Sequence, residues 1–173
     1  MKYDNLLKYR VYAGERALEE LGFIDVKKSY IKWVQYVNEY EKGAKLYDGF
    51  SEVIKILNEK GIICAIASSK TKKQYEIDFF KTGLQEYMKS VVLAEDTKRH
   101  KPHPDPILKA IEILDIKPED SIYIGDTIFD SRASKAANMD FALVQWSGAN
   151  ASKIEADYYL KEPIDILKLL KIG

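Results

Sequence analysis

The stretch SIYIGDTIFD, residues 121–130, is the part of the sequence that decides the fold class. Its first half is a short apolar run of the kind found in strands that are buried on both faces. The run ends at a glycine and Asp126, and Asp130 follows at the spacing of one helical turn. The stretch therefore predicts a strand that turns into a helix, with two carboxylates at the junction.

The same succession of strand and helix extends over most of the chain. We expect a helix that Ser51 caps and Gly61 ends, which is followed by a continuous apolar strand, IICAIAS. The remaining expected strands are 90–94, 121–126 and 141–146, and the remaining expected helices are 74–81, 106–114, 131–138 and 164–171. Helices of this length between strands imply right-handed crossovers and an α/β fold of three layers, with a parallel, Rossmann-like sheet between helices.

The segment before this alternation is expected to be purely helical. Apolar residues recur at helical spacing from Leu6 to Leu21, and Gly22 offers a stop. The second helix, VKKSYIKWVQYVNEY (residues 26–40), carries one broad apolar stripe that suits core packing better than a substrate pocket. The chain thus divides into a helical part, residues 1–44, and an α/β part, residues 45–173.

Composition excludes several classes of partner. Apolar residues make up 46% and charged residues 31% of the 173 residues, as in soluble globular proteins, and we expect a cytoplasmic protein. Twenty-seven basic residues balance twenty-seven acidic ones, so we expect neither a nucleic acid nor a membrane as partner. The single cysteine, Cys64, lies in an apolar run and is expected to be an inert core thiol.

Polar residues follow three of the expected strands and should meet at one edge of the sheet. Ser68 and Ser69 follow the first strand, Lys101 comes after the second, and Asp126 and Asp130 follow the third. In parallel sheets, ligands bind beyond the carboxyl ends of the strands. Serine hydroxyls and a lysine suit a phosphoryl group, and carboxylates suit Mg²⁺, so the pattern predicts a phosphate and magnesium site.

Each of these signals has a simpler explanation when it is taken alone. A serine after a strand is usually a turn or cap residue, a lysine before proline is usually solvated, and acids at a helix start usually only cap the helix. His100 and His103 flank Lys101, and exposed loop positions account for them without a chemical role. The ordered sequence of three signals, each after a strand, favours the functional interpretation.

In this order the motifs resemble those of the haloacid dehalogenase superfamily, over residues 46–170. Ser68 matches the hydroxyl of the family's second motif, Lys101 in KPHPDPILKAIEIL matches the lysine of the third, and IYIGDTIFDSRASKAANM matches the fourth. The resemblance implies a Mg²⁺-dependent phosphatase with a small phosphorylated substrate. It assigns Ser68 and Lys101 to catalysis, with Ser69 also binding phosphate, and assigns Asp126 and Asp130 to the metal.

The family's first motif, Asp-x-Asp-x-Thr at the end of a first strand, has no counterpart, because the sequence contains no Asp-x-Asp. The resemblance therefore implies that residues 1–44 are a partial helical cap, and that the strand expected between those ending at Ser68 and Asp126 is missing. Three ways of closing the gap remain open. The neighbouring strands pair directly, another protomer or a second chain supplies a strand, or the natural protein is longer.

Three functions follow from this departure. The first is a phosphatase whose activity is impaired or whose nucleophile comes from outside the chain, because losing a nucleophile costs several orders of magnitude in rate. The second is an inactive phosphate-binding and metal-binding or regulatory module. The third is an assembly protein, such as a homo-oligomer, that uses the fold without its site.

Overall fold

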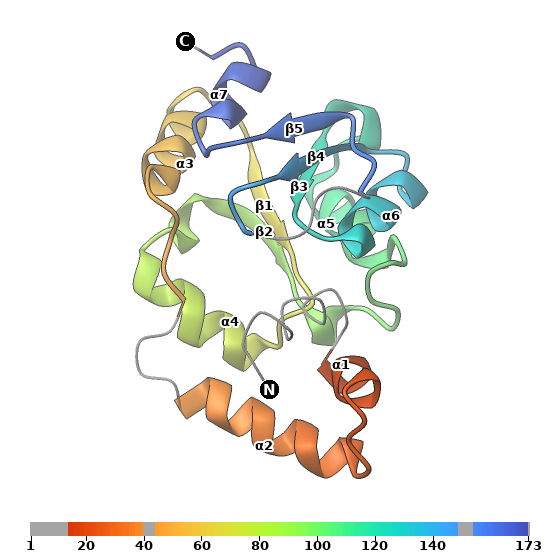
Figure 1. Cartoon of the computed structure of the whole chain (residues 1–173). Helices are drawn as coiled ribbons and strands as arrows, with labels where there is room; N and C mark the ends of the chain where they lie inside the picture. The colour runs from red at the N-terminus through yellow and green to blue at the C-terminus, as the bar shows by residue number, and fades with distance from the viewer. Residues whose placement is uncertain (1–13, 40–43, 149–153, 173) are drawn as a thin grey trace. The chain divides into compact units, whose positions relative to one another are not determined.

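The computed structural model describes residues 14–39, 44–148 and 154–172 (Figure 1). The chain separates into two compact units, Met1–Gly43 and Ala44–Gly173. The first part of the first expected helix falls on residues 1–13 and lies outside the described residues.

Residues 14–39 of the first unit form two helices, α1 (Gly14–Glu20) and α2 (Val26–Glu39). Gly22 has a φ of 80° just beyond α1, so the expected stop is confirmed. Tyr30 and Trp33, both from the expected stripe, meet edge to face with ring centroids 6.1 Å apart. A Cβ on Gly14 would lie 2.3 Å from the Tyr30 ring. The stripe of α2 therefore packs against the start of α1, which only glycine allows at this position.

The second unit alternates helices and strands, as expected. Its strands are β1 (Cys64–Ala67), β2 (Met88–Val92), β3 (Ile122–Gly125), β4 (Asp140–Val144) and β5 (Tyr158–Leu160). Its α-helices are α3 (Phe50–Glu59), α4 (Lys72–Phe79), α5 (Asp105–Leu114), α6 (Ile128–Ala136) and α7 (Asp165–Leu169). Short 3-10 helices occupy Phe80–Thr82, Gln85–Tyr87, Ala94–Asp96 and Pro118–Asp120.

The strands form two parallel sheets (Figure 1). One has the order β1-β2 and the other the order β3-β4-β5. Every strand pair is parallel, as expected. No ladder joins β1 to β3 within the described residues, so the alternative in which these two strands pair directly is wrong.

Strand β4 shows why helices cover both faces. Ala142 and Val144 pack with α3 and α7 residues such as Leu57 and Leu167. Phe141 and Leu143, which alternate with them, belong to a separate cluster with Ile154. A strand that is buried on both faces has a continuous apolar sequence, which is the pattern observed here. The three-layer α/β arrangement is therefore confirmed.

Several expected boundaries were wrong by a few residues, and one strand was missed. Helix α3 begins at Phe50 after Gly49, whose φ is 78°, so Ser51 lies inside the first turn and does not cap the helix. Helix α6 begins at Ile128 rather than 131, because Thr127 caps it. Strand β5 was not expected, since three residues, YYL, are too short for a clear alternation.

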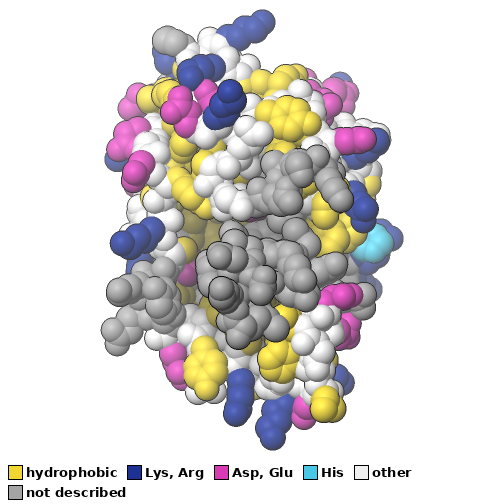
Figure 2. Space-filling model, viewed as in Figure 1, with side chains coloured by type: hydrophobic (Ala, Val, Ile, Leu, Met, Phe, Trp, Pro, Cys, Tyr) yellow, Lys and Arg dark blue, Asp and Glu magenta, His cyan; other side chains and the backbone are white. Residues whose placement is uncertain are grey.

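The surface of the described residues carries mixed charge, and Figure 2 shows basic and acidic side chains interspersed on one face. Among the helices of the described ranges, none has the length and apolar character needed to cross a bilayer.

Candidate active site

The turn between β3 and α6 is held together by the side chain of Asp130. Its Oδ2 accepts hydrogen bonds from the backbone N–H groups of Asp126 and Thr127, at 3.2 and 2.9 Å, and from the Thr127 hydroxyl at 2.6 Å. The Thr127 Oγ1 in turn accepts from the Asp130 N–H at 3.1 Å, which completes a capping box. The helix start thus fixes the position of this carboxylate.

Gly125 allows Asp130 to lie against the backbone of β3. A Cβ at position 125 would come within 2.7–2.9 Å of the Asp130 Cβ, Cγ and Oδ2 atoms. Real Cβ atoms do not approach their neighbours this closely. The glycine is therefore required for close packing of Asp130 rather than for an unusual backbone angle.

The other oxygen of Asp130 binds Lys101, whose ammonium group reaches it from the loop before α5. The Lys101 Nζ lies 2.6 Å from the Asp130 Oδ1, and the two side chains are only 13% and 6% exposed. A buried ion pair of this kind needs further hydrogen bonds to offset desolvation. Tyr123 and Ala67 supply them, because the Lys101 Nζ also donates to the Tyr123 hydroxyl at 2.9 Å and to the Ala67 carbonyl at 3.4 Å.

The electrostatics of the pair favour its charged form. Burial works to lower the pKa of Lys101, but the neighbouring Tyr123 and Asp130 raise it above the ordinary lysine value. Burial works to raise the pKa of Asp130, but the Lys101 charge and the Lys101 and Thr127 hydrogen bonds lower it overall. Burial raises the pKa of Tyr123 to about 12, so the phenol stays neutral at physiological pH.

Tyr123 links the two sheets at this point. Its hydroxyl donates to the Ala67 carbonyl at 2.8 Å, from β3 to the last residue of β1. The residue after Ala67 is Ser68, which donates its backbone N–H to the Val92 carbonyl of β2. Lys101 and the expected serines therefore lie at the same carboxyl edge of the strands.

Ser68 and Ser69 lie in the loop between β1 and α4. The Ser68 hydroxyl accepts from the backbone N–H of Lys70 at 3.2 Å, and Ser69 is exposed. Lys70 pairs with Asp78 on α4. The Ser68 hydroxyl keeps its own proton available for donation to a ligand.

The expected site residues differ in how closely they contact one another. Lys101 and Asp130 are in direct contact, and Asp126 joins them through its backbone N–H. Both oxygens of Asp130 are engaged by donors. The Asp126 carboxylate is half-buried and receives no hydrogen bond from a described residue. Asp126 therefore has free oxygens at this edge, whereas Asp130 would have to release donors to bind a cation.

This donor set fits Mg²⁺ only as a weak site. No group of three or more His, Cys, Asp or Glu residues within the described ranges could hold a metal ion. Protein-bound Mg²⁺ often keeps several waters and takes one or two carboxylates plus substrate phosphate oxygens. Asp126 can supply one such carboxylate.

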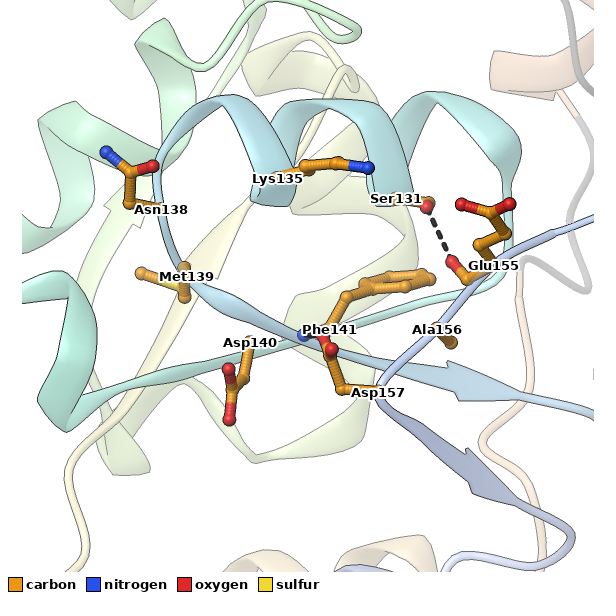
Figure 3. A pocket seen from close by; sticks show the side chains of 9 residues that line it. All are labelled: Ser131, Lys135, Asn138, Met139, Asp140, Phe141, Glu155, Ala156 and Asp157. Atoms are coloured by element: carbon orange, nitrogen blue, oxygen red, sulfur yellow. Dashed lines mark hydrogen bonds between the residues drawn. The ribbon is translucent and has the colours of Figure 1, made fainter.

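Within the described residues, no hydrogen bond joins a histidine side chain to this cluster. His100 and His103 are exposed. A hollow of about 430 Å³ opens at the amino end of β4 and is lined by residues from α6, β4 and the approach to β5 (Figure 3). Ser131 and Glu155 meet there through a 2.7 Å hydrogen bond from the serine hydroxyl to the Glu155 carbonyl. None of the expected site residues lines this hollow.

Two residues of the cluster were missed by the sequence interpretation. Thr127 had a signal, because a threonine three residues before an acid is a capping-box pattern. Tyr123 had none, because alternation in a strand gives the face of a side chain and not its partner on another strand.

Comparison with known proteins agrees with this arrangement. The family model of haloacid dehalogenase-like hydrolases matches residues 1–144. The chain belongs to the haloacid dehalogenase-like hydrolases. The parallel α/β fold of the second unit agrees with this membership.

Several relatives of this chain are pyrophosphatases by name. It is 31% identical over 127 residues to the pyrophosphatase PpaX of Bacillus cereus, covering 72% of this chain and 59% of the relative. It is 30% identical over 131 residues to PpaX of Anoxybacillus flavithermus, covering 74% of this chain and 61% of the relative. This haloacid dehalogenase-like chain thus spans about 60% of the length of these curated relatives.

Solved structures share the fold of this chain. A Lactobacillus plantarum protein with the provisional name phosphoglycolate phosphatase superposes with a TM-score of 0.90 at 26% identity, covering 98% of this chain and 83% of that one. A haloacid dehalogenase-superfamily phosphatase from Thermococcus onnurineus superposes with a TM-score of 0.73 at 23% identity, covering 97% and 86%.

Proposed function

We propose that this chain provides the phosphate-binding and metal-binding groups of a Mg²⁺-dependent phosphatase that acts on a small phosphorylated metabolite. The observation that supports this best is the Lys101 ammonium group, which is buried at the carboxyl edge beside Ala67 and Asp130. A lysine fixed by a carboxylate at such an edge is a preformed partner for an anionic ligand.

Each residue has a distinct role in this proposal. Lys101 neutralises part of the phosphoryl charge, and the Ser68 and Ser69 hydroxyls donate to phosphoryl oxygens. Asp130 holds Lys101 in place through the 2.6 Å contact, which assigns it to positioning while the pair is intact. Asp126 would hold Mg²⁺, which when bound would polarise the phosphoryl oxygens and balance their charge.

The family resemblance implies that the residues of the first unit belong to a helical cap. The covalent route of the family also needs a carboxylate nucleophile from an Asp-x-Asp motif, and residues 1–173 contain none. We therefore expect these residues on their own to turn over a phosphate ester poorly or not at all.

One observation favours a second candidate, an inactive module that binds phosphate and a divalent cation without turnover. The charge of Lys101 is already matched by Asp130, and both partners are buried. A bound phosphate therefore adds negative charge that this neutral pair does not fully balance, and a divalent cation held by Asp126 would offset it. The nucleophile is not needed for such binding.

Two measurements separate these candidates. Calorimetry with inorganic phosphate, with and without Mg²⁺, reports binding, and hydrolysis of p-nitrophenyl phosphate with Mg²⁺ reports turnover. Residual turnover that Asp126→Asn abolishes would identify a phosphatase, even if the rate is low, whereas heat of binding with no measurable turnover favours the binding module. Ser68→Ala should weaken phosphate binding by about tenfold, since one hydrogen bond to a charged ligand is worth about 1.5 kcal/mol.

The matched control is Ser131→Ala, because the Ser131 hydroxyl lies at the hollow near the amino end of β4, where it donates to the Glu155 carbonyl. Equal loss of phosphate affinity in both serine variants would contradict the proposed site. Absence of both heat and turnover in the unaltered chain would leave the assembly function and reject the proposal.

A further inference from the structure

Lys101 lies in a short loop whose two ends are joined by an ion pair. The Nε of Arg99, just before Lys101, lies 2.9 Å from the Oδ1 of Asp105, just after it. Asp105 is the first residue of α5, which begins directly after this loop. The Arg99 side chain is 63% exposed and that of Asp105 24%, so the pair extends from the surface to the start of the helix.

Backbone contacts within the loop form a turn around Lys101. The His103 N–H donates to the His100 carbonyl at 2.9 Å. The Thr97 hydroxyl donates to the Arg99 carbonyl at 3.2 Å and so holds the backbone just before this turn. His100 and His103 are exposed, whereas the Lys101 side chain is only 13% exposed. The turn thus presents one buried ammonium group among exposed neighbours.

The carboxylate of Asp105 depends on Arg99 for hydrogen bonding. Its second oxygen, Oδ2, is buried and has no hydrogen-bond partner among the described residues. A buried carboxylate oxygen without a donor is unfavourable, so the bond from Arg99 to the other oxygen and the N-terminal dipole of α5 offset part of this cost. The pair therefore favours a fixed separation between the start of α5 and the backbone before Lys101.

The Lys101 ammonium group needs a firmly held loop because its acceptors lie on other elements. Its Nζ lies 2.6 Å from the Asp130 Oδ1, at the start of α6, and 2.9 Å from the Tyr123 hydroxyl on β3. A shift of the loop by about 1 Å would break contacts of this length. The position of the ammonium group therefore depends on what holds the ends of the loop together.

We propose that Arg99 and Asp105 are positioning residues for Lys101. The pair clamps the two ends of the loop and so keeps the ammonium group beside Asp130, where it can meet an anionic ligand. Arg99 itself does not contact the ligand. Only the effect of this clamp on phosphate binding rests on the proposed function. In the simpler alternative, Asp105 favours only the helix dipole and Arg99 is a solvated partner.

Nuclear magnetic resonance of the Lys101 ammonium protons tests the clamp in the whole chain. The signal is assigned by its absence in Lys101→Arg. We expect Arg99→Met and Asp105→Asn each to speed the exchange of these protons with water by about threefold, as suits a partly exposed ion pair. The double variant should match the single ones, because all three break the same pair. Arg99→Lys keeps the charge and should restore part of the protection.

A second ion pair on α5 provides the matched control. Lys109 and Glu112 are partners with an Nζ–Oε2 distance of 2.9 Å, and their pair does not span the loop. Lys109→Met should leave the exchange at Lys101 unchanged. Unchanged exchange in Arg99→Met and Asp105→Asn, or an equal change in Lys109→Met, overturns the inference. If Asp105→Asn does not fold, Arg99→Met still decides, because its side chain is mostly exposed.

Calorimetry with inorganic phosphate on the same variants separates the clamp from the proposed function. We expect the phosphate affinity to fall by about threefold in Arg99→Met and to stay unchanged in Lys109→Met. If the unaltered chain binds no phosphate, the proposed function fails, whereas the exchange measurement still decides the clamp. A fall in affinity without faster exchange at Lys101 would place Arg99 on the ligand itself and overturn its positioning role.

Discussion

The Lys101 ammonium nitrogen lies 2.6 Å from the Asp130 Oδ1, in a pair that is almost completely shielded from solvent. The two residues are 29 positions apart in sequence, and Lys101 lies in a loop whereas Asp130 lies in the first turn of α6. Their contact ties the loop before α5 to the start of α6. It also makes each residue depend on the other, because a buried charge without its partner is costly.

Removing one partner of this pair should be far more costly than removing both. We expect Lys101→Met to lower the free energy of unfolding by about 3–5 kcal/mol, because it leaves the Asp130 carboxylate buried and uncompensated. The double variant Lys101→Met, Asp130→Asn should be more stable than Lys101→Met alone. Urea unfolding of the four proteins in the cycle measures the coupling. Additive single effects would contradict a buried ion pair.

Stability should depend on pH at both extremes. The pKa of Asp130 is lowered, so its contribution is present above the unfolded value of about 3.9 and is lost as the pH falls through the folded value. The pKa values of Lys101 and Tyr123 are raised, that of Tyr123 to about 12. The contributions of these two groups to the free energy of unfolding are therefore complete below about pH 10. They are lost as the pH rises through the pKa values of the groups in the folded protein.

Urea unfolding between pH 4 and pH 11 checks the alkaline limb. The decline above pH 10 should be shallower in Tyr123→Phe, which removes one of the two groups responsible, and the neutral plateau should be lower because the Ala67 carbonyl loses a hydrogen bond. Identical alkaline slopes in the two proteins would argue against a buried phenol with a raised pKa.

Gly125→Ala should destabilise the protein by displacing Asp130. The new methyl group would meet the Asp130 side chain at less than 3 Å, and overpacking of this kind costs about 1–3 kcal/mol. This loss of stability arises from the displacement of Asp130. It should therefore be smaller in a Lys101→Met background, where the ion pair with Asp130 is already broken. Gly61→Ala is the control, since its Cβ has open space and only its φ of 74° causes strain. Its cost should not change with Lys101.

The capping box of α6 should be sensitive to the Thr127 hydroxyl. Thr127→Ala removes a donor to Asp130 Oδ2 and an acceptor for the Asp130 N–H, and should cost about 1–2 kcal/mol. Thr127→Ser keeps the hydroxyl and should cost much less. Thermal unfolding distinguishes the two, and equal losses would show that the methyl group rather than the cap is responsible.

The sequence alone was sufficient to predict the main helices and strands of the second unit. The apolar runs around Cys64 and Ile122 are visible because parallel strands are buried on both faces, and the stops at Gly22 and Gly61 follow from backbone angles open to glycine. Boundaries were less certain, since the start of α6 depends on a side-chain cap and β5 has only three residues. The sequence also placed Ser68, Lys101 and Asp126 after strands.

What the sequence by itself determined is the order of local elements and the chemistry of each loop, because periodicity and turn residues act over a few positions. Only the tertiary structure decided that Asp130 binds Lys101, that Tyr123 reaches the Ala67 carbonyl, and that β1 and β3 remain unpaired. These relationships join residues that are distant along the chain. Their geometry is set by how the helices and sheets pack, which local sequence patterns do not encode.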